Sequence, residues 1–282
     1  MPPVPRRRRL TTSIAALLCA LVAGQTAVAC AFHTYTPNPT LIDRLYDSEQ
    51  VVLARPDPGA PQRLVPFAAL AGELEYVELP PGLSAETARA LRGTRDAAVL
   101  FARDGAYGPW LQLAVLDPAQ RDVVDTALAR RDDWERGTGL DRQRYFARQL
   151  ASPSPGVRRL ALLELDRLDY DALRSLGPRP GAAVTADVAA GDPDLRPIRV
   201  LLAGLSGDPA VRAPLEAGFA DAVARDLRYL GAYATALIEL DRGDAVRRLV
   251  AAPLSNAAPR PDTAERGAPR RRTPAPGPTI SR

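Results

Sequence analysis

The chain has 282 residues, of which 46% are hydrophobic, so it can fill the cores of two domains, and this excludes wholesale disorder. It contains one histidine, two cysteines and no lysine, which excludes lysine Schiff-base chemistry, the lysine-dependent phosphate loop, and metal sites that need several histidines or four cysteines. Residues 30–252 hold 27 arginines against 31 acids, so the net charge of +4 comes from the excess of arginine at the two ends of the chain. The acidic balance of residues 30–252 argues against nucleic-acid binding by this part of the protein.

The first 29 residues have the features of an export signal. The arginines from Arg6 to Arg9 precede an apolar run from Ile14 to Val22, and the small residues Ala27 and Ala29 suit a signal peptidase. We therefore predict a signal peptide over residues 1–29 with cleavage after Ala29. The alternative is an uncleaved anchor, although polar residues interrupt the roughly 20 apolar residues that a span needs. The arginine run also resembles a twin-arginine signal.

Cleavage after Ala29 would make Cys30 the first residue of the mature chain and its only cysteine. The segment Ala27–Cys30 resembles the lipoprotein box, which ends in a lipidated cysteine. The protein is then either a membrane-tethered lipoprotein or a periplasmic or extracellular protein with a free Cys30 thiol. In the second case Cys30, His33 and the terminal amine offer ligands for Cu or Zn, or for a redox function. The alternative for His33 is a packing residue in a proline-rich segment.

Residues 30–117 have the pattern of a small β-domain. β-Branched and aromatic residues occur in short runs between proline and glycine clusters, and a helix over Ser84–Arg92 is indicated by Ser84 as its cap and Gly93 as its stop. Five strands and one helix predict a closed or partly open five-stranded barrel. The predicted strands are Gln50–Ala54, Arg63–Phe67, Leu74–Leu79, Ala97–Ala102 and Trp110–Leu116.

A start at Cys30, the segment Ser48–Arg55 and the closing Leu70–Gly72 resemble the netrin-like barrel of tissue inhibitors of metalloproteinases, which is an OB-type fold. The resemblance implies that the amine and carbonyl of Cys30 chelate a protease zinc. The chain departs from the family because it lacks the Cys-x-Cys start and the disulfide framework.

Beyond Pro118 the hydrophobic period becomes helical. We predict a bridging helix over residues 118–140 and a helical domain over residues 141–252. Acids at 132, 133 and 135 alternate with arginines, so we interpret them as a solvated face rather than as metal ligands. Val-Arg pairs at Val157, Val211 and Val246, each followed by apolar residues four and eight positions on, resemble HEAT-type repeats. Their spacing is irregular, so a compact bundle is the alternative.

Particular residues of the helical domain carry further predictions. Leu165 and Leu237 are expected in the core, and small residues such as Ala236 should let a central helix approach its neighbours. Aromatic pairs either line a binding groove or belong to the core, and these are Tyr145 with Phe146 and Tyr229 with Tyr233. The proline- and arginine-rich tail, residues 253–282, is predicted to be disordered, either as a basic tether or as an inert terminus.

The fold class predicted is α+β, with the β-domain followed by HEAT-like helices. Nucleophilic catalysis needs a positioned base and His33 is the only imidazole, so we predict no enzyme. The expected function is that of an exported interaction or scaffold protein whose partner is another exported or envelope protein. Contact with a membrane is expected only through the signal peptide or a lipid on Cys30. The alternative is a Cu- or Zn-binding or redox protein that uses Cys30 and His33.

Overall fold

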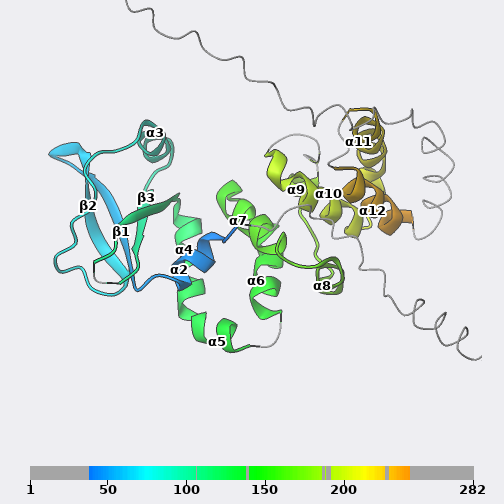
Figure 1. Cartoon of the computed structure of the whole chain (residues 1–282). Coiled ribbons are helices and arrows are strands. Elements are labelled where there is room, and N and C mark those ends of the chain that lie inside the picture. The colour runs from blue at the N-terminus through cyan, green and yellow to red at the C-terminus, as the bar shows by residue number, and fades with distance from the viewer. Residues whose placement is uncertain are drawn as a thin grey trace, which may run out of the picture.

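The computed structural model describes residues 38–105, 107–137, 140–185, 188, 192–225 and 229–241. The predicted signal peptide, Cys30, His33, the third Val-Arg pair at Val246 and the tail lie outside these residues. The architecture is α+β, as predicted, with a sheet at one end and helices in the rest of the molecule (Figure 1). None of the described helices is long and apolar enough to cross a membrane.

The sheet has four antiparallel strands in the order β2-β1-β3-β4. Four of the five predicted strands are confirmed, and the predicted barrel is replaced by an open sheet whose edges are β2 and β4. The fifth strand, Leu74–Leu79, is wrong because Tyr76 has φ of 59° and turns the chain. The strands are β1 (Gln50–Asp57), β2 (Ala60–Ala71), β3 (Ala98–Arg103) and β4 (Leu111–Leu116).

The two faces of the sheet are covered by different elements. Side chains alternate along β1, so Val51 and Leu53 face α2 (Leu41–Tyr46) and α4 (Pro118–Ala129), whereas Val52 faces the side of α3 (Ala85–Gly93). The helix α3 confirms the prediction over Ser84–Arg92, and the Ser84 Oγ accepts a hydrogen bond from the Thr87 N–H at 3.0 Å. The central parts of β1 and β3 are therefore buried on both faces.

Helices fill the rest of the described chain, and one hydrophobic cluster runs from the sheet through α2, α4, α6 and α7 to α8 and α10. The predicted bridging helix is two helices, α4 and α5. Leu165 is fully buried in this cluster, as predicted. The remaining elements are α5 (Arg131–Arg136), α6 (Asp141–Gln149), α7 (Pro155–Leu165), α8 (Tyr170–Leu176), α9 (Ala182–Thr185), η1 (Pro193–Leu195), α10 (Arg196–Leu205), η2 (Pro209–Val211), α11 (Arg212–Ala224) and α12 (Leu230–Asp241).

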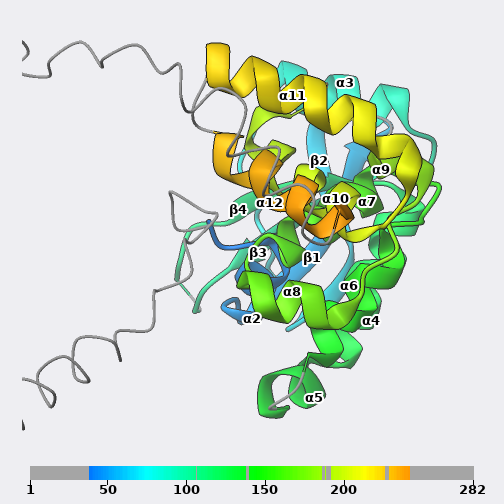
Figure 2. The same cartoon turned by 90° about the vertical axis from the view of Figure 1, so that its right-hand side faces the viewer.

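A second hydrophobic cluster joins α10, α11 and α12 at the end of the molecule opposite the sheet (Figure 1), and Figure 2 views the molecule from that end. Here α12 packs against both neighbours and is central, as predicted, and it contains the buried Leu237. A Cβ atom at Gly204 of α10 would lie 2.5 Å from the Ala236 Cα, so the two helices meet at their backbones. Tyr233 is buried in this cluster, and Phe146 is fully buried in the first one. The predicted groove of aromatic residues is therefore wrong, and the core interpretation is confirmed.

Candidate functional site

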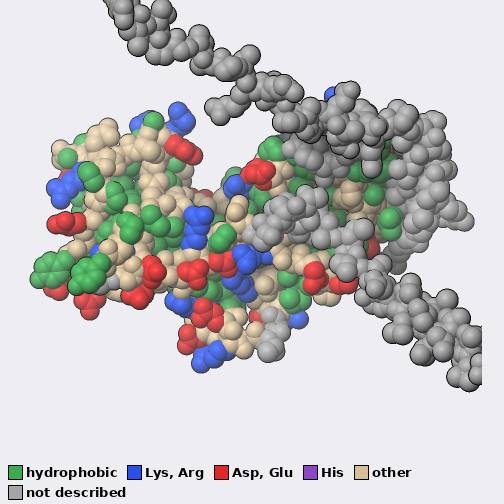
Figure 3. All heavy atoms as spheres, viewed as in Figure 1, with side chains coloured by type: hydrophobic (Ala, Val, Ile, Leu, Met, Phe, Trp, Pro, Cys, Tyr) green, Lys and Arg blue, Asp and Glu red, His purple; other side chains and the backbone are tan. Residues whose placement is uncertain are grey.

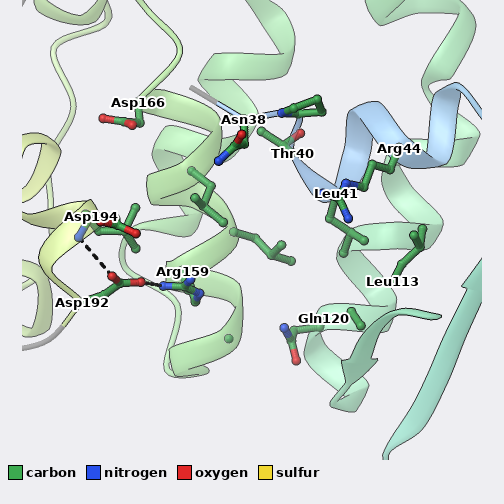
Figure 4. A pocket seen from close by; sticks show the side chains of 16 residues that line it. Asn38, Thr40, Leu41, Arg44, Leu113, Gln120, Arg159, Asp166, Asp192 and Asp194 are labelled. Atoms are coloured by element: carbon green, nitrogen blue, oxygen red, sulfur yellow. Dashed lines mark hydrogen bonds and ion pairs between the residues drawn. The ribbon is translucent and has the colours of Figure 1, made fainter. Parts of the chain in front are cut away.

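A cleft of about 590 Å³ opens where α2, the α4 end of β4, α7 and η1 meet (Figure 4). Its walls combine leucines and alanine with charged and amide side chains. The apolar lining consists of Leu41, Leu113, Ala114, Leu160, Leu163 and Leu195, and the polar side chains are those of Asn38, Thr40, Arg44, Gln120, Arg159, Asp166, Asp192 and Asp194.

The floor of the cleft is formed where α4 and α7 begin. Asp117 caps α4 and Ser154 caps α7, and the Ser154 hydroxyl donates a hydrogen bond of 2.8 Å to the Asp117 carboxylate. A Cβ atom at Gly156 would lie 2.4 Å from the Gln120 side-chain carbon, so the end of the Gln120 side chain lies directly against the start of α7. The capping residues therefore fix the floor through interactions between segments that are distant in the sequence.

Charged side chains occupy two opposite walls of the cleft. Arg159 of α7 pairs with Asp192, and the Asp192 carboxylate also accepts the Asp194 N–H at 3.1 Å. The hydrogen bond from Arg159, followed by that from the Asp194 backbone, holds the pKa of Asp192 below its ordinary value. Across the cleft on α2 lies Arg44, which is exposed and whose side chain forms no ion pair with another described residue. The cleft thus presents Arg44 on one side and, on the other, the ion pair of Arg159 with Asp192 beside Asp194.

A buried polar network fixes α2 relative to α6 and α7. The Arg142 guanidinium of α6 donates to both carboxylate oxygens of Glu164, at 2.8 and 2.9 Å. It also donates to Asp43 Oδ1 at 2.9 Å and to Thr40 Oγ1 at 3.1 Å, and Arg167 pairs with the second oxygen of Asp43. Because α2 and α7 form walls of the cleft, this network holds the cleft open in one shape.

The same network shifts the pKa of its charged groups. Burial acts to raise the pKa of Asp43, but the Thr40 N–H and the charges of Arg142 and Arg167 outweigh burial and lower it. Burial likewise acts to lower the pKa of Arg142, and Glu164 and Asp43 outweigh it.

One consequence is a loss of stability in acid. The lowered pKa values of Asp43 and Asp192 mean that their stabilisation is complete above the unfolded-state pKa of about 4 and is lost as the pH falls through the folded-state values. We expect the melting temperature to fall steeply below about pH 4. The variant Asp43→Asn should show a shallower fall than the wild type, measured by circular dichroism. Parallel profiles for the two proteins would contradict this assignment.

The residues that the sequence singled out are not among the described residues that line the cleft. Cys30 and His33 fall outside the described residues, so lipidation and Cu or Zn binding there stay predictions. The acids of α5 form a solvated face, as predicted: Asp132 pairs with Arg136 and Glu135 with Arg131, both at 3.3 Å and one helical turn apart. Within the described part of the chain, no group of three or more His, Cys, Asp or Glu side chains is placed to hold a metal.

Sequence reasoning missed the cleft. Its lining comes from segments as far apart as Asn38 and Leu195, and each one looks like an ordinary helix start or helix face. The capping pattern from Thr40 to Asp43 is readable as the start of a helix. It does not reveal that this start lies beside α7.

Comparison with known proteins gives no relative from which a role could be transferred. No protein-family model, curated protein or solved structure matches the chain.

Proposed function

We propose that the protein is an exported, non-enzymatic interaction protein that binds a segment of another exported protein in the cleft between α2 and α7. The observation that carries this proposal is the preformed cleft itself, with an apolar lining and opposite charges on its walls. A volume near 590 Å³ falls within the range of sites that enclose a ligand.

The lining suggests what the bound segment contains. An aliphatic or aromatic side chain fits among Leu41, Leu160 and Leu163, and burying one contributes about 2 kcal/mol. An acidic group beside it would meet Arg44, and a donor on its other side would meet the carboxylates near η1. Charge on both walls therefore favours a peptide segment of mixed polarity.

The finer architecture is part of the same proposal. HEAT-type packing is supported by the adjacent pairs α6 with α7 and α11 with α12. Val157 lies in the first turn of α7, and Val211 directly precedes α11. The netrin-like relationship of the β-domain remains a resemblance in layout, now with four strands.

A photo-crosslinker at the cleft tests the function. With p-benzoylphenylalanine at Asn38, on the exposed rim of the cleft, we expect irradiation of intact cells to join the protein to one exported partner. The same group at Ile238 of α12, which is exposed and does not line the cleft, is the matched control and should not form that adduct.

The purified partner then gives a quantitative test. Arg44→Glu reverses the charge of one wall, so we expect its affinity to fall by about tenfold or more. Arg136→Glu on α5 is the matched control and should leave the affinity unchanged. The proposal would be refuted if the crosslinkers at Asn38 and Ile238 gave the same amount of the same adduct. It would also be refuted if a folded Arg44→Glu variant bound the partner with unchanged affinity.

A further inference from the structure

A second surface lies away from the cleft, at one end of the sheet. Five large hydrophobic side chains are exposed in the described residues, and four of them belong to the same region: Leu74, Tyr76, Tyr107 and Leu111, which we name the sheet-end patch. Tyr76 is 92% exposed and Tyr107 is 100% exposed. Figure 3 shows hydrophobic side chains protruding at the far end of the sheet beside acidic ones. Clustered exposed apolar groups of this kind mark binding surfaces.

The strand register brings the patch together. Ala71, Val51, Ala102 and Leu111 follow one another across all four strands as one rung of the ladder. The chain leaves β2 at Ala71 toward Leu74 and Tyr76, and the turn that contains Tyr107 joins β3 to β4 at this same end. Four strands are spaced about 4.8 Å apart, so the patch spans about 14 Å.

Carboxylates surround the patch, and all four are exposed without an ion pair to another described residue: Glu49, Glu73, Glu75 and Asp104. The basic residue at this end, Arg103, already interacts with neighbouring side chains. It donates to Gln50 at 2.6 Å and lies 4.7 Å from the centre of the Trp110 ring. The sheet-end patch therefore combines exposed aromatic rings with a local excess of negative charge.

We propose that the chain's own tail, residues 253–282, docks on the sheet-end patch. The tail carries six arginines, two acids and many prolines, for a net charge of +4. Proline-rich segments bind grooves lined by aromatic rings, and arginines stack on tyrosine and pair with carboxylates. The composition of the tail thus complements both features of the patch.

The tail is long enough to reach. The described chain ends in α12, at the opposite end of the molecule from the sheet (Figure 1). The stretch from Asp241 to Arg270 extends to roughly 90 Å at about 3.1 Å per residue. A compact chain of about 200 residues has a radius of gyration near 17 Å, so the tail can pass along the molecule. Tethering raises the effective concentration of the tail, which suits a shallow patch.

A competition experiment on the mature full-length protein tests this inference. The probe is a fluorescent peptide of residues 253–282. We expect it to bind a protein whose Arg270, Arg271 and Arg272 are replaced by serine, and to bind wild type about tenfold more weakly because the native tail already covers the patch. In the serine-substituted protein, Tyr76→Gly should weaken peptide binding about tenfold. It should not lower the melting temperature, because glycine tolerates the left-handed backbone at this position.

Matched variants separate this effect from misfolding and from general charge. Tyr107→Ser and Glu73→Gln with Glu75→Gln should also weaken the peptide, whereas Ile238→Ser and Asp122→Asn with Asp125→Asn should not. Equal affinity of the peptide for the wild type and for the serine-substituted protein would overturn the proposal. So would a peptide affinity that the substitutions at Tyr76, Tyr107, Glu73 and Glu75 leave unchanged. If the wild type formed concentration-dependent oligomers, and the serine-substituted protein did not, the tail would dock on a second copy of the chain. That result would overturn docking within one chain. None of these outcomes depends on the cleft.

Discussion

Replacing Leu165 by alanine should lower the free energy of unfolding by about 2 to 5 kcal/mol. Leu165 ends α7, is fully buried and belongs to the cluster that joins the sheet to the helices, so the surrounding elements cannot easily close the cavity. Urea unfolding followed by circular dichroism measures the change, provided the denaturant slope stays constant.

Two further variants serve as comparisons for Leu165→Ala. Leu237 belongs to the second hydrophobic cluster, and its side chain is 5% exposed. Leu237→Ala should therefore lower the free energy of unfolding by an amount in the lower part of the range of about 2 to 5 kcal/mol. Leu74→Ala is the exposed control and should change stability by less than about 0.5 kcal/mol. A loss for Leu165→Ala as small as that of the control would show that α7 does not pack as described.

Removing the Glu164 carboxylate should lower the free energy of unfolding by about 3 kcal/mol or more, since Glu164→Ala leaves the part-buried Arg142 without its bidentate partner. Glu164 is 3% exposed, so water cannot readily replace the lost acceptor. Asp43 and Thr40 still accept bonds from Arg142, which keeps the expected loss near the lower end for a broken buried pair.

A double-mutant cycle isolates the interaction. The losses from Glu164→Ala and Arg142→Met should not add, because either change alone breaks the same pair. Asp141→Asn breaks the exposed pair with Arg144 on the same helix and should cost less than about 1 kcal/mol. If the buried and the exposed variants lost equal stability, the network would not be what fixes α2 beside α7.

Local interactions could be predicted from the sequence because they act between residues close in the chain. Ser84 caps α3 in the structure as its side chain and position suggest. The apolar run in β3 is buried on both faces, and Leu165 and Leu237 fall on the inner stripes of their helices. Charge interleaving on α5 likewise gave a solvated face, since ion pairs one helical turn apart need no tertiary partner.

The predicted fifth strand shows where this reasoning fails. Alternating apolar residues at 74–79 fit a strand, but Val77 and Leu79 pack against the α3 side of the sheet from a loop. The alternation did not report which side chains contact the core, because Leu74 and Tyr76 are exposed while Val77 and Leu79 pack on the sheet from a loop. The left-handed backbone at Tyr76, which decides between a strand and a loop, is set by packing and leaves no mark in the residue pattern.

The acidic balance of residues 30–252, the composition of the tail, the Ser84 cap and individual core residues such as Leu165 and Leu237 followed from the sequence alone. The tertiary structure was needed to show that, among the described arginines, Arg142 lies between Asp43 and Glu164 and that Arg44 and Arg159 line the cleft. Arg142 meets Asp43 and Glu164 across separations of 99 and 22 residues, and the patch gathers side chains through strand register. Both sites arise because folding places distant segments side by side, and a single sequence contains no local signal for such contacts.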